Sequence, residues 1–99
     1  MQVTHHFSGR EYAKACVIPA GDSHDQHVHT YDHLSILAQG TAWVTVDDKT
    51  ECFTGPVCLT IKAGKSHKVT ALTDVHWFCI HASDENDPET VDQTLIKGN

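Results

Sequence analysis

The feature that most constrains this chain is a series of short apolar runs separated by turn-forming residues at intervals of about ten. The runs are Gln2–Phe7, Tyr12–Ile18, His27–His29, Leu34–Leu37, Ala42–Val46, Thr50–Phe53, Val57–Ile61, Lys68–Leu72 and Val75–His81. The segments between them are rich in glycine, proline, aspartate and serine, which tolerate turn geometry. Such closely spaced runs are typical of many short strands, so the sequence predicts an all-β chain.

Short strands need their edges covered, because unpaired backbone groups on an edge invite aggregation. A closed barrel or a jelly roll covers them most economically. With 99 residues the chain is long enough for one core and too short for two, so we expect a single domain over residues 1–99.

The last part of the chain has a different pattern. Asp87, Pro88 and Glu89 form a helix start, with a capping residue, a proline at the first helical position and an acid in the first turn. Val91 and Leu95 follow one turn apart. A short C-terminal helix from about Pro88 to Ile96, docked by that apolar pair, is predicted.

The charge balance excludes some partners. A net charge of −6 disfavours nucleic acid and anionic membrane surfaces, which are bound by neutralising phosphates with Lys and Arg. The first residues lack the basic segment and apolar run of a secretory signal, and no stretch approaches membrane-spanning length. We therefore expect a cytoplasmic protein whose four cysteines are reduced thiols.

Nine histidines are the most unusual count in the composition. His27 and His29 are two residues apart, so on a strand both would point to one face. His33 can join them if the chain bends over residues 30–32, and His67 arrives after a tight turn. Four neutral imidazoles suit one divalent ion of Fe, Mn, Co, Ni, Cu or Zn.

The spacing of these histidines resembles a family pattern. The stretch Gly21-x5-His27-x-His29-x3-His33-x6-Gly40 resembles the first motif of the cupin superfamily, and residues 63–67 resemble the second, which ends in the ligand His67. The first motif usually has a glutamate where this chain has His33, and the second usually opens with a proline where it has Lys62. The resemblance spans about residues 21–71 and implies a cupin-type β-barrel, the double-stranded β-helix.

The resemblance also implies the ligand set. His27, His29 and His67 match the metal-binding positions, and His33 in place of the carboxylate makes the site similar to those of the all-histidine subgroup. Loss of one negative charge leaves the site more tolerant of a bound anion or a redox-active metal. Chance placement on solvated strands is the alternative for this four-histidine site. For the histidines without partners at ligand spacing, surface or hydrogen-bonded roles are expected: His5, His6, His24 and His76.

The last predicted strand offers a pocket lining. Alternation puts Trp77, Cys79 and His81 on one side and the more aliphatic set 76, 78 and 80 on the other; we favour the first set as facing the metal. Ordinary core packing is the alternative for Trp77, and a small buried hydrophobe for Cys79. Asp25 and Tyr31 are candidates to hold a ligand imidazole through its second nitrogen.

The chemistry that the resemblance implies is that of a mononuclear metal-dependent oxidoreductase of dioxygenase type, acting on a small organic substrate. A metal-dependent sensor or small-ligand binder without turnover is the second hypothesis. Isomerase or lyase action needs a general base, for which only Tyr12, Tyr31 or His81 could be proposed. A small-molecule ligand and a symmetric homodimer are the expected partners.

Overall fold

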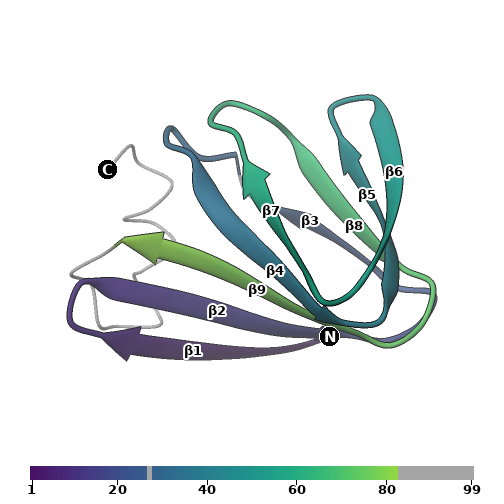
Figure 1. The fold of residues 1–99 in the computed structure, drawn as a ribbon, viewed down its shortest axis with the longest axis horizontal. Helices are drawn as coiled ribbons and strands as arrows, with labels where there is room; N and C mark the ends of the chain where they lie inside the picture. The colour runs from purple at the N-terminus through teal and green to yellow at the C-terminus, as the bar shows by residue number, and fades with distance from the viewer. Residues whose placement is uncertain (27, 83–99) are drawn as a thin grey trace.

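The computed structural model describes residues 1–26 and 28–82, which form strands joined by turns (Figure 1). The strands are β1 (Gln2–Ser8), β2 (Glu11–Ile18), β3 (Ser23–Gln26), β4 (His33–Gln39), β5 (Thr41–Val46), β6 (Lys49–Thr54), β7 (Val57–Ile61), β8 (His67–Ala71) and β9 (Val75–Ala82). No helix within these two ranges is long and apolar enough to cross a membrane. The predicted C-terminal helix lies outside the described residues.

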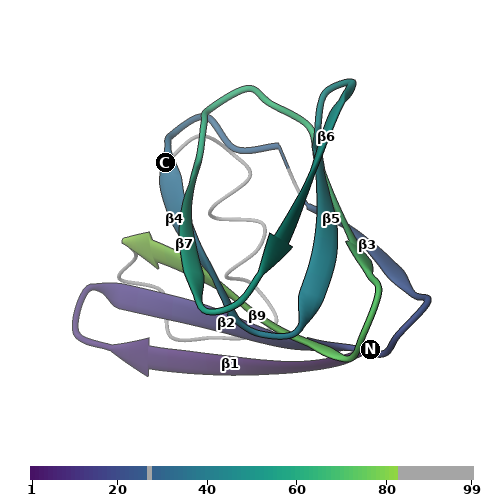
Figure 2. The same cartoon turned by 45° about the vertical axis from the view of Figure 1, so that its right-hand side comes forward.

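The strands form two antiparallel sheets that face each other, as Figure 2 shows. The larger sheet has the order β1-β2-β9-β4-β7, and the smaller has the order β3-β8-β5-β6. Apart from the hairpins β1–β2 and β5–β6, neighbours in each sheet are not consecutive in the chain, as in a jelly roll. The prediction of an all-β double-stranded β-helix is therefore confirmed.

The core lies between the sheets and follows the alternation of each strand. On β9, for example, Val75, Trp77 and Cys79 are buried, and the residues between them are exposed or half-buried. The same alternation on the other strands completes an apolar cluster formed by Cys16, Ile18, Leu37, Ala42, Val44, Val69, Ala71, Val75, Trp77 and Cys79. One end of the interior is polar instead. His33 begins β4, His67 begins β8, and His81 lies near the end of the antiparallel β9.

One predicted strand is wrong. We expected a strand over His27–His29, but the strand in this region is β3, which ends at Gln26. Among the described strands it pairs with β8 alone, and the pairing stops where Gln26 lies opposite His67, the first residue of β8. Beyond that point no described strand continues the ladder, and residues 28–32 lie outside the sheets. The other predicted runs fall on strands whose ends differ by two residues at most.

Gly40, between β4 and β5, is needed for its backbone conformation and its lack of a side chain. Its φ is +100°, and a Cβ there would collide with the carbonyl oxygen of Asp74. Gly9 also has a positive φ, of +57°, but a Cβ there would meet open space.

We expect Gly40→Ala to lower the free energy of unfolding by about 2 kcal/mol or more, because strain and a backbone collision add. Gly9→Ala, which carries the strain alone, should lower it by about 1 kcal/mol. Urea denaturation followed by circular dichroism would measure both. Equal losses in the two variants would contradict the role assigned to the Asp74 contact.

Candidate metal centre

Three buried imidazoles meet at the polar end of the interior. One ring nitrogen from each of His29, His33 and His81 lies within 4.8 Å of those of the other two. The centroids of the His33 and His81 rings are 4.4 Å apart, and that of His29 lies 5.1 Å from His33 and 4.9 Å from His81. All three side chains are less than a tenth exposed. We call this group the histidine cluster.

Two strands and one loop position the histidine cluster. Leu34 on β4 is opposite Ile80 on β9, so continuation of this register places the preceding His33 directly opposite the following His81 on the interior face. His29 comes from the loop over residues 28–32, which lies outside the sheets.

That loop is fastened to the turn over residues 62–66. The amide of Gly64 donates to the carbonyl oxygen of His29 at 2.9 Å, and the amide of Ala63 donates to Asp32 Oδ1 at 2.8 Å. Asp32 also forms an exposed ion pair with Lys62, with 3.4 Å between Oδ2 and Nζ. The backbone donors hold the loop that carries His29 against the turn that precedes β8.

Tyr31 holds the ring of His81. Its hydroxyl lies 3.0 Å from His81 Nδ1, a hydrogen bond whose direction depends on the imidazole tautomer. When Nδ1–H donates to Tyr31 Oη, the lone pair of His81 is on Nε2. A metal-bound imidazole commonly has its second nitrogen fixed in this way.

His67 is a fourth buried imidazole beside the histidine cluster. Its Nδ1–H donates to the carbonyl oxygen of Lys65 at 3.0 Å, which leaves Nε2 as the nitrogen with a lone pair. Burial lowers the pKa of His67, and a protonated His67 would help to lower the pKa of His33. His67 therefore lies within electrostatic range of His33.

Burial keeps His33 and His81 uncharged at neutral pH. Loss of solvent lowers the pKa of His33 to about 4, aided by the neighbouring charges of His29 and His67. Desolvation also lowers the pKa of His81 to about 3, with contributions from His33, His29 and Lys14. Neutral imidazole is the form that binds a metal ion, so these rings need to release no proton first.

The residues present fit a metal ion. Neither ring nitrogen of His33 has a hydrogen-bond partner among the described residues, although both are buried. A buried polar atom without a partner is costly. Tetrahedral nitrogens at zinc-like bond lengths lie roughly 3.4 Å apart, so small side-chain rotations would bring three nitrogens within 4.8 Å into a coordination sphere.

The structure brings together part of the set that the sequence predicted. His29 and His33 are in the histidine cluster, His67 lies beside it, and His27 is outside the described residues. Because β3 ends at Gln26, the argument that placed His27 and His29 on one strand face does not hold. Sequence analysis placed His81 in the pocket lining and not among the ligands. Its place in the alternation of β9 was the signal that could have found it.

The other predicted lining residues are buried on the same face of β9 as His81. Cys79 Sγ lies 3.0 Å from Gln26 Oε1 and 3.7 Å from Ser35 Oγ, which places it in a polar setting. Trp77 is fully buried within the apolar core, and its indole nitrogen has no hydrogen-bond partner among the described residues. Asp25, a predicted partner for a ligand imidazole, is exposed on β3, whereas Tyr31 contacts His81.

Comparison with known proteins identifies the fold. No protein-family model matches the sequence, and no curated protein matches it. The structure is similar to a cupin 2 conserved barrel domain protein from Salinispora arenicola, with a TM-score of 0.73 and 18% identity over 93% of this chain and 80% of that one. A cupin 2 domain-containing protein from Halorhodospira halophila has a TM-score of 0.74 and 18% identity over 92% of this chain and 73% of its own.

A cupin superfamily protein from Desulfitobacterium hafniense gives a TM-score of 0.68 and 23% identity over 84% of this chain and 79% of its own. At such identities the likeness concerns the fold, and this chain therefore has the cupin fold.

The lowered pKa values make the metal-free protein sensitive to mild acid. In the unfolded chain the histidines take up protons near their ordinary pKa of 6.5, whereas in the folded chain His33 and His81 do so only near 4 and 3. The stability that these groups contribute is complete above pH 6.5 and is lost as the pH falls toward 4.

We expect the free energy of unfolding to fall by up to about 2.7 kcal/mol per pH unit in this window, about 1.4 kcal/mol for each of the two groups. Urea denaturation of metal-free protein at several pH values would measure it. His81→Gln should reduce the slope, because it removes one of the two groups. An unchanged slope in that variant would contradict the assignment.

Proposed function

We propose that this chain, with its cupin fold, binds one divalent transition-metal ion through His29, His33 and His81, with His67 as a fourth ligand. The convergence of three buried imidazoles at one end of the barrel carries this proposal. Three nitrogens within 4.8 Å make a chelate possible with little rearrangement. His67 supports it as the neighbouring imidazole whose Nδ1 is already fixed by a carbonyl.

The donor set suggests the kind of metal. Imidazole suits Fe, Mn, Co, Ni, Cu and Zn, and a site of imidazoles without a carboxylate leaves the ion's two positive charges uncompensated. When bound, such an ion would supply Lewis-acid or redox chemistry to an organic substrate or to O2. On this basis we further propose an oxidoreductase of dioxygenase type that acts on a small organic molecule.

The chain's own residues would orient and shield that site. Tyr31 fixes His81 from outside the cluster, and its hydroxyl can hold or move a proton at Oη. The hydrogen bonds that the amides of Gly64 and Ala63 donate to the loop carrying His29 keep that imidazole in place without a metal. The opposed sheets exclude bulk water from the ring nitrogens of His33.

Metal content of the purified protein tests the site. The full chain, purified without oxygen and analysed for elements, should contain about one transition-metal ion, and His33→Ala and His81→Ala should lose most of it. Exposed histidines provide matched controls, since His6→Ala and His76→Ala should retain it. Full metal content in His81→Ala would contradict the three-histidine site.

Removal of the Tyr31 hydroxyl tests how the site is supported. We expect Tyr31→Phe to weaken metal affinity about 10-fold, because partners of ligand imidazoles typically contribute 10- to 100-fold. Titration of metal-free protein with Co(II), followed by absorption, would measure the affinity. Unchanged affinity would show that Tyr31 does not orient a ligand.

Oxygen uptake separates catalysis from binding. Protein loaded with Fe(II) or Mn(II) should consume O2 in the presence of one member of a panel of diketones, phenols, thiols and alkenes. The metal-depleted His33→Ala variant is the control. Stable metal binding without oxygen uptake across the panel would favour a ligand-binding or sensing protein instead.

A further inference from the structure

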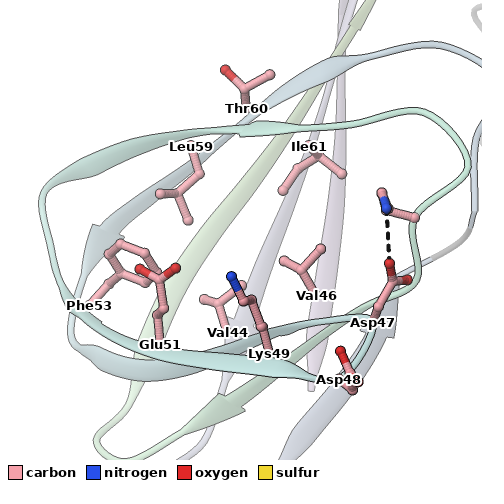
Figure 3. Close-up of a pocket in the computed structure, with 11 residues that line it drawn as sticks. Val44, Val46, Asp47, Asp48, Lys49, Glu51, Phe53, Leu59, Thr60 and Ile61 are labelled. Carbon is pink, nitrogen blue, oxygen red and sulfur yellow. Dashed lines mark ion pairs between the residues drawn. The ribbon is translucent and has the colours of Figure 1, made fainter.

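A pocket opens on the side of the barrel, between the edge strands of the two sheets. It has a volume of about 540 Å³ and lies between β7 and the hairpin of β5 and β6 (Figure 3). Five apolar side chains from these strands point into it, namely Val44, Val46, Phe53, Leu59 and Ile61. We call this space the seam pocket.

The strand register connects the seam pocket to the histidines. Ile61 on β7 is directly opposite His33 on β4, and Val46 on β5 is directly opposite His67 on β8. Opposed residues of an antiparallel pair point to the same face, with Cβ atoms about 5 Å apart. Ile61 and Val46 therefore line the seam pocket on one side and adjoin the proposed metal ligands on the other.

The charged residues that line the seam pocket restrict the kind of ligand that it can bind. Its charged lining consists of three acids, Asp47, Asp48 and Glu51, and two lysines, Lys49 and Lys65. Lys65 is already paired with Asp47, with 3.2 Å between Nζ and Oδ2. The remaining balance is slightly negative, which disfavours an anionic ligand.

Inward-pointing charges on an edge strand have a second use, since they block pairing with another chain. Lys49 and Glu51 on β6 fit that role (Figure 3). Protection of the edge does not account for the apolar walls, which come from both sheets and leave a space of ligand size.

We propose that the seam pocket is the substrate chamber of the histidine site and takes a neutral organic molecule with an aromatic or branched aliphatic body. The apolar body would lie against Leu59 and Phe53, and an oxygen-bearing end would reach past Ile61 toward the histidine cluster. This inference rests on the proposed metal site, because it names the substrate class of that site.

The seam pocket can be tested without a metal. The probe is 2-naphthol, a neutral fused ring with one oxygen, and its affinity for the metal-free full chain is measured by equilibrium dialysis. Leu59→Trp fills the pocket and should raise the Kd about tenfold. Leu34→Trp, the same substitution at an exposed position on the outer face of β4, is the matched control and should leave it unchanged.

Phe53→Ala serves as a second variant and removes the aromatic wall, so the test remains valid if Leu59→Trp does not fold. It should also weaken binding. The anionic 2-naphthoate should bind more weakly than 2-naphthol to the unmodified chain. Unchanged Kd values in every folded pocket variant, or tighter binding of 2-naphthoate, would overturn the proposal.

Proximity to the histidine cluster is measured separately. Co(II) added to the 2-naphthol complex should quench the naphthol fluorescence, and His33→Ala should abolish the quenching while leaving the dialysis result intact. If elemental analysis shows metal bound but the fluorescence does not change, the seam pocket does not belong to this site. If no metal binds but the dialysis results hold, the metal proposal fails and the ligand pocket stands.

Discussion

Burying an imidazole costs free energy unless its ring nitrogens find partners, and the described part of this chain buries four of them at one end of its barrel. Some of that cost is met inside the protein, by Tyr31 for His81 and by the carbonyl of Lys65 for His67. For His33 the described residues offer nothing. A cation would convert this costly arrangement into a favourable one, and for this reason we read the histidine cluster as a binding site.

The residues that stabilise the fold and the histidines whose burial costs free energy lie in different parts of the barrel. Along β9 the buried face changes from Val75 and Trp77 at one end to His81 at the other, so the apolar core and the histidine cluster share strands but occupy different ends. The hydrogen bonds that the amides of Ala63 and Gly64 donate to the loop carrying His29 then hold an imidazole that no described strand carries. The site can thus exist in the metal-free fold, at the expense of stability in mild acid.

Most of the architecture could be predicted because apolar runs and turn residues are local signals. The alternation of side chains along each strand then assigns each residue to the buried or the exposed face. The ligand geometry depends on where each ladder stops. The end of β3 at Gln26 follows from its pairing with β8, which sequence spacing cannot show. His81 was placed on the interior face by alternation, but its nearness to His33 follows from the register between β4 and β9, which is set by tertiary pairing.

Strands β6 and β7 follow each other in the chain but belong to different sheets, and each is the last strand of its own. On this side of the barrel, β6 and β7 do not pair with each other in the ladders of the described strands. The apolar side chains between β6 and β7 close this side by packing and not by backbone hydrogen bonds. Parting the walls would break van der Waals contacts and the exposed ion pair between Asp47 and Lys65, while every ladder on either side remains intact.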